Sequence, residues 1–351
     1  MPIPSPVRII PGYLPQNNAA NEKGGQVSHT KKNLIKVKNL KKHFSSGLFH
    51  KTCVKAVDGI SFCIPSGKTL GMVGESGSGK STVGRCILRL IEPTCGEIYF
   101  QGKDILATKG DHRNLRKQMQ IIFQDADGSM NPRIKVIDQL LEPLRVHKLL
   151  NGQIKETAAD LMKLVNLSAD LMDRYPHELS GGQRQRIGIA RAISINPGFI
   201  VADEAAASLD LLVQAQMMDL LKRLQSERGI SYLYISHNLP IIRRMADTVA
   251  VMYLGRFVET GKTKDIFNSP AHPYTQALLS AVPSINPLAR PKKNMLRGEI
   301  PSPLQPSCGC SFHPRCSQAG TICSQIIPEK RHIGRDHWAW CHFVSHKRAA
   351  A

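Results

Sequence analysis

An α/β fold with a parallel β-sheet is predicted by two observations on the sequence. Strand-like and helix-like segments alternate from residue 34 onward, which is typical of parallel strands joined by helices. An apolar strand-like stretch, residues 68–73, also continues through a Gly/Ser-rich loop, residues 74–81, into a helix-like segment. A strand–loop–helix unit of this kind belongs to an α/β sheet.

The individual elements follow from the periodicity of apolar residues. Alternating or continuous apolar residues predict strands at 34–40, 55–64, 96–102, 199–204, 230–236 and 248–255. Helical spacing predicts a helix after the Gly/Ser loop, with Val83, Ile87 and Leu90 on one face, and largely helical structure at 134–176, 211–229 and 239–247. After Pro283 the pattern ends, and we expect a separate small tail.

Charge is the unusual feature of the composition. The chain of 351 residues carries 47 Lys and Arg against 27 Asp and Glu, a net charge of +20, with the excess at both ends. This balance favours an anionic partner, such as a nucleotide, a nucleic acid or a membrane surface, or else describes two solvated arms. Neither a signal-like apolar region nor an apolar window of membrane length occurs, so we expect a cytosolic protein in which structural disulfides are rare.

Residues Gly74 to Ser81 match the phosphate-loop pattern G-x-x-x-x-G-K-[ST] in the required strand–loop–helix context. The glycines let backbone N–H groups face phosphate oxygens, and the helix N-terminus adds a partial positive charge. Lys80 is expected to reach the β- and γ-phosphates, and Ser81 is expected to coordinate Mg²⁺. The loop therefore predicts a site for a nucleoside triphosphate with magnesium.

Two acidic residues end the apolar strand FIVAD. Asp203 is placed to hold the water shell of Mg²⁺, and Glu204, which follows at once, can polarise an attacking water. An isolated Asp-Glu pair is an ordinary strand end. Together with a phosphate loop, the pair predicts hydrolysis of the bound nucleotide.

A second phosphate-grasping helix start occurs in ELSGGQRQRIGIARA, residues 178–192. It lies too far along the chain to serve the first loop, which indicates a nucleotide held between two subunits. Here the chain resembles the ABC-type ATPases: Leu179-Ser180-Gly181-Gly182-Gln183 is similar to their signature, and further motifs follow the family's order over residues 34 to 262. These further motifs are the Q-loop (Gln124), the D-loop (Ser208-Leu209-Asp210), the switch histidine (His237) and an adenine-stacking aromatic (Phe44).

The resemblance implies a role for each matching residue. It implies catalytic roles for Glu204, His237 and Gln124, and Mg²⁺ contacts from Ser81, Gln124 and Asp203. The signature would act on the partner's ATP, and its residues are Ser180, Gly181, Gly182 and Gln183, beside Asp210 of the D-loop. The implied ATP-binding residues are Phe44, Gly74, Ser76, Gly77, Ser78, Gly79, Lys80, Ser81 and Thr82. Ala205, Ala206 and Asn238 depart from the family pattern, and these changes bear on the subunit contact rather than on the chemistry.

The stretches HPYTQALLSAVP (272–283) and SMNPRIKV (129–136), with the late cysteines, are similar to ATP-binding subunits of dipeptide/oligopeptide permeases, in particular the second ATPase of a dipeptide permease. That resemblance implies an ATP hydrolase that powers peptide import, peripheral at the cytoplasmic face of the inner (plasma) membrane. Its partners would be a second ATPase subunit, expected to be a different chain, two transmembrane permease subunits and a substrate-binding protein, with no nucleic acid. The transported substrate stays open, because the ATPase does not touch it.

The same resemblance implies a P-loop NTPase fold. It would comprise a RecA-like parallel-sheet core, an antiparallel β subdomain, a helical signature subdomain and a small Cys-rich C-terminal extension. The expected division is a flexible basic arm (1–33), a nucleotide-binding domain (34–285, with the helical subdomain at about 126–184) and the extension (286–351). The alternative is a soluble, non-transport ABC ATPase that acts on DNA or ribosomes. A single motif set and only 100 positions between Lys80 and Ser180 count against it.

Four late cysteines, Cys310, Cys316, Cys323 and Cys341, have the spacing C-x5-C-x6-C-x17-C. This matches neither the usual zinc spacing nor that of ferredoxins. From the residues alone, a four-thiolate site for zinc or an iron–sulfur cluster, or free thiols, remain open. The resemblance to dipeptide-permease ATPases implies a [4Fe–4S] cluster with these four ligands, with Zn²⁺ as the alternative and Cys308 as a spare thiol.

Overall fold

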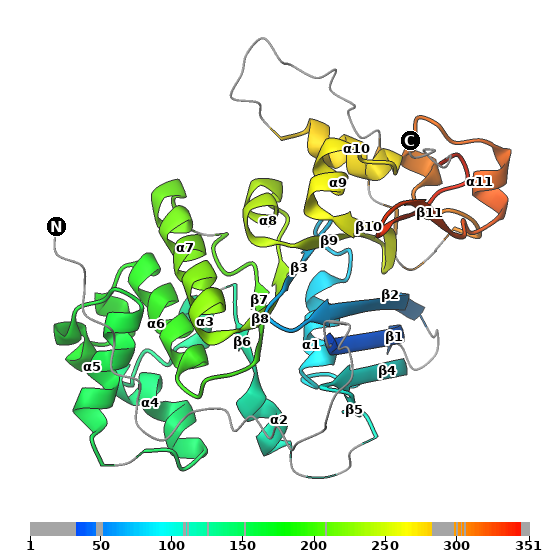
Figure 1. Cartoon of the computed structure of the whole chain (residues 1–351). Coiled ribbons are helices and arrows are strands. Elements are labelled where there is room, and N and C mark those ends of the chain that lie inside the picture. The colour runs from blue at the N-terminus through cyan, green and yellow to red at the C-terminus, as the bar shows by residue number, and fades with distance from the viewer. Residues whose placement is uncertain are drawn as a thin grey trace, which may run out of the picture. The chain divides into compact units, whose positions relative to one another are not determined.

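The computed structural model describes residues 33–46, 52–107, 110, 112–124, 126–150, 152–207, 209–282, 298–299, 301–302, 304 and 307–344. Two β-sheets form in this part of the chain, one of four strands and one of eight (Figure 1). The expected basic arm lies outside the described residues, apart from Asn33.

The four-stranded sheet is antiparallel and has the order β2-β1-β4-β5. Its strands are β1 (Asn33–Ser46), β2 (Thr52–Pro65), β4 (Cys95–Phe100) and β5 (Lys103–Asp104). Ile35, Val37 and Ile98 are fully or almost fully buried and pack into one hydrophobic cluster. The alternation of these apolar residues is the signal that predicted strands here, because successive side chains of a strand point to opposite faces.

The eight-stranded sheet has the order β11-β12-β10-β9-β3-β8-β7-β6. Its strands are β3 (Thr69–Val73), β6 (Met119–Ile122), β7 (Phe199–Asp203), β8 (Ser231–Ile235), β9 (Thr248–Tyr253), β10 (Arg256–Lys262), β11 (Lys330–Gly334) and β12 (His337–Trp340). The five strands β6, β7, β8, β3 and β9 pair in parallel, as the alternation of strands and helices predicted. The other three pair antiparallel.

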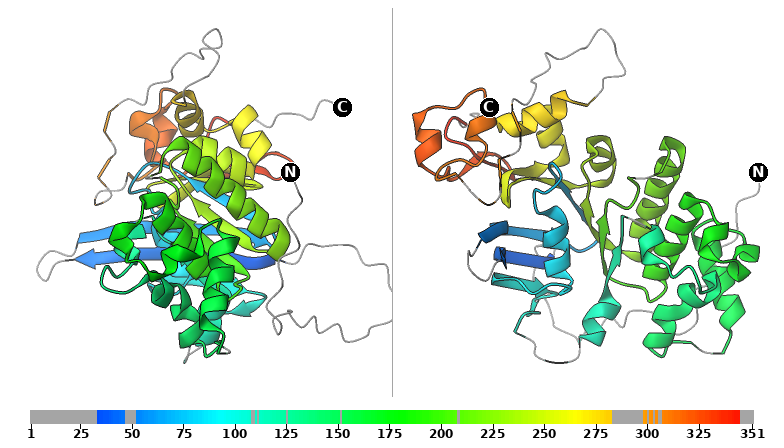
Figure 2. Two further views of the ribbon diagram at one scale, coloured as in Figure 1. Left: turned by 90° about the vertical axis from the view of Figure 1, so that its left-hand side faces the viewer. Right: turned by 180° about the vertical axis from the view of Figure 1, so that it is seen from behind.

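Helices cover both faces of the parallel strands. The helices are α1 (Lys80–Ile87), α2 (Arg113–Gln118), α3 (Ala126–Ser129), α4 (Val136–Val146), α5 (Ile154–Leu164), α6 (Gly181–Ile193), α7 (Leu211–Arg228), α8 (Leu239–Met245), α9 (Thr263–Asn268), α10 (Pro273–Ser280) and α11 (Thr321–Gln325), with short 3₁₀ turns η1 (Ala169–Asp173), η2 (Pro176–Glu178) and η3 (His313–Arg315). Seen from behind, α4, α5 and α6 and the C-terminal segment lie at opposite ends of the drawing, as in the first view (Figure 2).

Strand β8 shows how the core is divided between the two faces of the sheet. Leu233 and Ile235 belong to the cluster that contains α1 and the four-stranded sheet. Tyr232 and Tyr234 belong to the other cluster, which contains residues of α4 to α8. Because both faces are covered, the strand is apolar throughout, which is the usual pattern of a buried parallel strand. The helix α1 therefore lies between the two sheets, and the loop before it starts from the middle of the large sheet.

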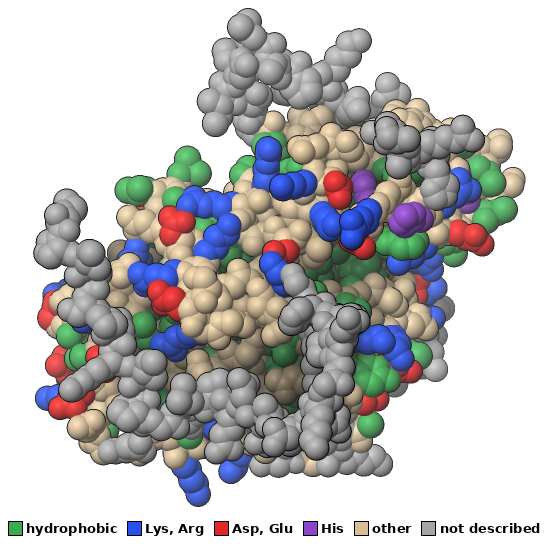
Figure 3. All heavy atoms as spheres, in the orientation of Figure 1, with side chains coloured by type: hydrophobic (Ala, Val, Ile, Leu, Met, Phe, Trp, Pro, Cys, Tyr) green, Lys and Arg blue, Asp and Glu red, His purple; other side chains and the backbone are tan. Residues whose placement is uncertain are grey.

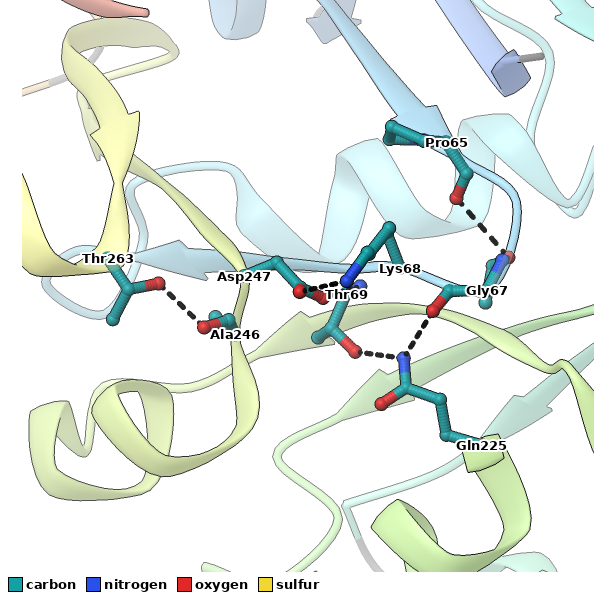
Figure 4. Close-up of polar contacts among 9 residues, drawn as sticks. Pro65, Gly67, Lys68, Thr69, Gln225, Ala246, Asp247 and Thr263 are labelled. Atoms are coloured by element: carbon teal, nitrogen blue, oxygen red, sulfur yellow. Dashed lines mark hydrogen bonds and ion pairs between the residues drawn. The ribbon is translucent and has the colours of Figure 1, made fainter. Parts of the chain in front are cut away.

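The beginning of β3 is fixed by polar contacts from two other elements (Figure 4). The carboxylate of Asp247 accepts hydrogen bonds from Lys68 Nζ at 2.7 Å and from the Thr69 N–H at 2.9 Å. The amide of Gln225, on α7, donates to Thr69 Oγ1 at 2.9 Å. These contacts set the position of β3 at the end opposite to the Gly/Ser-rich loop.

The C-terminal segment does not form the separate tail that the sequence predicted. Strand β12 pairs antiparallel with β10, so the hairpin β11–β12 extends the large sheet. Glu259 of β10 is fully buried and lies 2.7 Å from His337 Nε2 of β12. The same carboxylate accepts the N–H of His272 at 2.9 Å. Pairing and a buried polar contact together attach the segment to the core.

Helix α1 is shorter than the sequence predicted. The helix α1 ends at Ile87, so Leu90, which was expected on its apolar face, lies beyond the helix and is 49% exposed. Among the described residues, no helix has the length and apolar character needed to cross a membrane.

Candidate functional site

The phosphate loop lies between β3 and α1, and its glycines are required by the backbone conformation. Gly74, Gly77 and Gly79 have φ of 154°, 78° and 101°, in the region that side-chain-bearing residues avoid. A Cβ atom on Gly74 would lie 2.2 Å from the Met252 carbonyl oxygen, and one on Gly79 would lie 2.0 Å from that of Ala56. The loop is thus enclosed by backbone from β2 and β9.

Lys80 points into this loop and is only 5% exposed. Its ammonium donates to the carbonyl oxygens of Gly74 at 2.8 Å and Glu75 at 2.9 Å, and to Ser78 Oγ at 3.2 Å. Burial lowers the pKa of Lys80, and the carboxylates of Glu204, Asp203 and Glu75 oppose that shift. A buried ammonium among loop carbonyls is well placed to contact phosphate oxygens.

Two of the three residues predicted for magnesium, Ser81 and Asp203, meet at the end of β7. Ser81 Oγ donates to Asp203 Oδ1 at 2.9 Å. Burial raises the pKa of Asp203, and the hydrogen bond from Ser81 opposes this rise. Strands β3 and β7 flank β8 in the parallel sheet, so their carboxyl ends lie at one edge, where ligands of α/β sheets bind.

Glu204 and His237 form a pair at the same edge. His237 Nδ1 lies 2.8 Å from Glu204 Oε1. Glu204 has a positive φ of 49°, and its N–H donates to the Ile235 carbonyl at 2.9 Å, at the end of β8. This left-handed turn directs the carboxylate from β7 toward the residues that follow β8. A carboxylate held beside an imidazole can orient and polarise a water molecule.

Most of the remaining residues predicted for the nucleotide site are exposed. Gln124 lies after β6 and is exposed, and the neighbouring carbonyl of Phe123 accepts a hydrogen bond from Gln185 Nε2 at 3.2 Å. Ser76 and Gly77 are exposed at the tip of the loop, and Thr82 is partly buried in the first turn of α1. Phe44 on β1 is 43% exposed, with Lys42 Nζ 4.9 Å from its ring centroid, so it is not a buried core residue.

The signature residues lie on a different helix from the phosphate loop. Ser180 caps α6: its Oγ accepts from the Gln183 N–H at 3.3 Å, and its own N–H donates to Gln183 Oε1 at 2.9 Å. Gly181 is exposed, and a Cβ there would meet nothing within 4 Å. A Cβ on Gly182 would lie 2.9 Å from Val213 Cγ1. The signature therefore presents an open helix start to solvent.

The D-loop lies next to the signature. Asp210 caps α7, because its Oδ1 accepts the Val213 N–H at 2.9 Å, and Val213 is the residue that Gly182 faces. Leu211 and Leu212, which follow, are 82% and 70% exposed. Ser208 of the predicted D-loop lies outside the described residues.

The late cysteines lie near one another, but the predicted metal site is not supported. All nine cysteines are free thiols. Burial raises the pKa of Cys310 to about 11, and the proximity of Cys323, Cys341 and Cys316 contributes to the shift. Within the described ranges, however, no group of three or more His, Cys, Asp or Glu side chains is arranged to hold a metal ion. Neither the [4Fe–4S] cluster nor zinc therefore gains support from the structure.

Two residues that the sequence did not single out contact the phosphate loop. The N–H of Glu75 donates to Tyr274 Oη at 2.9 Å, and the guanidinium of Arg315 pairs with the Glu75 carboxylate at 2.7 Å. Tyr274 lies within the HPY stretch and Arg315 beside Cys316, so both were near noted motifs. No spacing rule connects positions 240 residues apart.

Models of known families match two parts of the chain. The model described as ABC transporter matches residues 57–207, which contain the phosphate loop and the signature. The model described as oligopeptide/dipeptide transporter, C-terminal region, matches residues 258–323, which contain Tyr274 and Arg315.

Relatives and solved structures agree with these matches. The dipeptide transport ATP-binding protein DppF of Escherichia coli (strain K12) is 48% identical over 306 residues, 86% of this chain and 92% of the relative. The oligopeptide transport ATP-binding protein AppF of Bacillus subtilis (strain 168) is 44% identical over 321 residues, 89% and 98% of the two chains. The ATP-binding cassette MJ0796, solved as a dimer in a post-hydrolysis state with ADP and Pi, has a TM-score of 0.59 at 27% identity, covering 65% of this chain and 98% of that one.

The shared fold thus carries a phosphate loop with its acidic partners and a separate signature helix. On the strength of relatives aligned over most of its length, this chain belongs to the ABC transporter ATP-binding proteins of the oligopeptide/dipeptide group.

Proposed function

We propose that this chain hydrolyses ATP to drive the import of dipeptides or oligopeptides through a membrane ABC transporter. The observation that carries the proposal is the meeting of Lys80, the Ser81–Asp203 pair and the Glu204–His237 pair at one edge of the parallel sheet. The peptide substrate is supported by relatives that are named for oligopeptide and dipeptide transport. Those relatives do not favour the alternative of a soluble ATPase acting on DNA or ribosomes.

We propose one role for each residue of the site. Lys80 and the loop N–H groups would bind the phosphates, Ser81, Asp203 and Gln124 would hold Mg²⁺, and Phe44 would stack on adenine. Glu204 takes a proton from the attacking water, and His237 orients Glu204 and the γ-phosphate. The loop would stabilise the charge that develops on the transferred phosphoryl group, and a bound Mg²⁺ would supply further positive charge, because phosphoryl transfer relies mostly on positioning and charge.

We further propose that the signature acts on ATP bound by a second ATPase subunit. Its exposed helix start, with Ser180, Gly181 and Gly182, has N–H groups available for a phosphate from another chain. The exposed Leu211 and Leu212 beside the D-loop are apolar surface of the kind that a partner subunit covers. Two permease subunits and a substrate-binding protein would complete a transporter at the cytoplasmic face of the inner (plasma) membrane.

The proposed division into a basic arm (1–33), a nucleotide-binding domain (34–285, helical part at about 126–184) and an extension (286–351) is retained with one change. Because β12 pairs with β10, we propose that the extension is joined to the sheet of the domain and is not a separate tail.

On the face drawn in Figure 3, the described Lys and Arg side chains are dispersed among acidic and uncharged groups.

A pull-down from detergent-solubilised membranes tests the proposed function. We expect transmembrane subunits and a second ATPase to co-purify, and the complex to hydrolyse ATP faster when a peptide-loaded binding protein is added. Co-purification of ribosomes or DNA without membrane subunits would contradict the transport proposal. Identification of the ligand on the co-purifying binding protein would define the substrate.

The [4Fe–4S] cluster, with Zn²⁺ as its alternative, is a separate proposal with narrower support. It rests on the resemblance of the four late cysteines, Cys310, Cys316, Cys323 and Cys341, to those of dipeptide-permease ATPases, because no metal-binding group is formed among the described residues. Four thiolates could hold an ion or cluster whose binding stabilises a short segment. Anaerobic purification should give a coloured protein with equal iron and sulfide; a colourless, metal-free protein would end this proposal.

A further inference from the structure

The phosphate loop makes an ion pair with the C-terminal extension. Arg315 Nη1 lies 2.7 Å from Glu75 Oε2, and Arg315 Nη2 lies 3.1 Å from Glu75 Oε1, so the contact is bidentate. The side chain of Arg315 is 6% exposed and that of Glu75 is 23% exposed. Two parallel, charge-assisted hydrogen bonds in a largely buried place fix both the distance and the orientation of the carboxylate.

A second contact holds the backbone of the same loop residue. The Glu75 N–H donates to Tyr274 Oη at 2.9 Å, from helix α10. Tyr274 packs on Tyr253 at 4.7 Å between ring centroids, and Phe312 packs on Tyr253 at 5.4 Å. The guanidinium carbon of Arg315 lies 6.0 Å from the Tyr253 ring centroid. The aromatic cluster of Tyr253, Tyr274 and Phe312 therefore positions both groups that contact Glu75, the Tyr274 hydroxyl and the Arg315 guanidinium.

The charge of Glu75 is unfavourable for the loop's proposed task. A loop that binds a triphosphate must attract a polyanion, yet Glu75 places a carboxylate in its second position. Its charge reaches the phosphate-binding Lys80, whose pKa is influenced by Glu75. A carboxylate left unpaired beside the phosphates would repel them, and the repulsion would be strong because the site is partly shielded from water.

We propose that Arg315 is a positioning residue of the nucleotide site: it neutralises Glu75 and, together with Tyr274, holds the second residue of the phosphate loop in its ATP-binding conformation. The inference rests on the proposed assignment of Gly74–Ser81 to ATP. It makes the C-terminal extension a part of the nucleotide site, supplied from a position 240 residues away along the chain. Arg315 acts through Glu75 and does not itself reach the substrate.

Steady-state ATP hydrolysis by the full-length chain in its purified complex tests this role. Arg315→Gln should raise the KM for MgATP roughly tenfold and change kcat much less, because the lost interaction concerns binding. The increase should shrink at high salt, since the repulsion from Glu75 is then screened. An unchanged KM in a folded Arg315→Gln protein would overturn the proposal.

A second substitution separates charge from packing. In the double variant Glu75→Gln with Arg315→Gln the repelling carboxylate is gone, so KM should return to within about threefold of the wild-type value. If Arg315 merely supported the fold, removal of the Glu75 charge would not rescue KM. Should Arg315→Gln fail to fold, Arg315→Lys keeps the charge with one hydrogen bond; a KM near that of wild type is expected, and a tenfold higher KM would contradict the charge argument.

Two controls make the outcome specific. Arg335 is exposed on the β11–β12 hairpin, so Arg335→Gln removes the same charge from the extension away from the loop and should leave KM unchanged. Lys80→Ala tests the underlying site. If Lys80→Ala leaves ATP binding intact, the assignment of the loop is wrong; if it abolishes binding while Arg315→Gln has no effect, only the role of Arg315 falls.

Discussion

The two glycine-rich helix starts of this chain differ in how they are enclosed. The phosphate loop before α1 is surrounded by its own chain: Cβ atoms on Gly74 and Gly79 would overlap backbone oxygens, and Lys80 is buried. The signature before α6 is open, with Gly181 exposed and nothing within 4 Å of its Cβ position. The helix start before α1 is thus enclosed by its own chain, whereas the helix start before α6 exposes backbone N–H groups to solvent.

This difference indicates how one sequence can contribute to two nucleotide sites. The enclosed loop is held by β2, β9, Tyr274 and Arg315, so its shape is set before any partner arrives. The open signature is held by the reciprocal hydrogen bonds between Ser180 and Gln183, with Gly182 facing Val213 of α7. Substitutions in the phosphate loop should therefore change folding and nucleotide binding. Substitutions in the signature should change ATP hydrolysis by the assembled transporter.

The largest effect is expected at the enclosed site, from Glu204→Gln. The amide keeps a hydrogen bond to water but cannot accept a proton, so turnover should fall by ~10²–10⁴ while ATP binding stays intact. ATPase assays together with ATP-binding measurements check this. Glu156→Gln, an exposed position on α5, is the matched control and should have no effect. Unchanged hydrolysis would remove Glu204 from the mechanism.

Paired glycine substitutions test the comparison directly. Gly79→Ala forces a Cβ to within 2.0 Å of the Ala56 oxygen at a φ of 101°, so stability should fall by about 2–3 kcal/mol and ATP binding should be lost. Gly181→Ala adds a methyl group in open space and should leave the stability and ATP binding of the isolated chain unchanged. Its effect should be seen only as lost turnover in the assembled transporter.

Thermal unfolding, ATP binding and ATPase activity distinguish the two variants. If Gly181→Ala destabilises the isolated chain as much as Gly79→Ala does, the two helix starts are not differently enclosed. If Gly181→Ala leaves the turnover of the assembled complex unaffected, the signature does not act on a partner's nucleotide.

A smaller effect is expected from Phe44→Ala, on strand β1. Loss of stacking on adenine typically costs ~1–3 kcal/mol, so the KM for ATP should rise roughly tenfold with little change in stability, because the side chain is 43% exposed. Phe343→Ala, at a position 53% exposed in the extension, serves as control. Reduced stability with an unchanged KM would identify Phe44 as a packing residue.

The last expected effect is on stability alone and concerns the pH dependence of the contacts that enclose the phosphate loop. Burial lowers the pKa of His272, which precedes α10, from 6.5 to about 4. Below about pH 6.5 the unfolded chain binds a proton that the folded chain does not, so stability is complete above this pH and falls as the pH drops toward 4. The loss should reach about 1.4 kcal/mol per pH unit. Urea unfolding at pH 7 and pH 5 measures it.

The control for this prediction is the same substitution at an exposed histidine. His272→Gln should remove this part of the pH dependence, whereas His177→Gln, at an exposed position in η2, should retain it. Equal slopes in both variants would show that another group is responsible.

Much of the fold and of the candidate site could be predicted because the signals are local. Residues 74–81 contain the whole phosphate loop, and their glycines are there because the backbone adopts positive φ. Asp203 and Glu204 end a continuous apolar run, and Ser180 with Gln183 has the spacing of a capping box. In the phosphate loop and the capping box the interacting residues are close in sequence, so their spacing specifies the geometry. Asp203 and Glu204 are marked only by the strand that they end, and their partners Ser81 and His237 lie 122 and 33 positions away.

Only the tertiary structure decided how the C-terminal extension meets the phosphate loop. The hairpin β11–β12 is short and carries no clear alternation, so its pairing with β10 depends on the edge that β10 offers and on the buried Glu259–His337 contact. Arg315 and Glu75 are far apart in the chain, and a pair of opposite charges has no sequence signature of its own. Closing so long a loop costs entropy, which the contacts of the sheet and of the aromatic cluster offset, so the whole core brings these residues together.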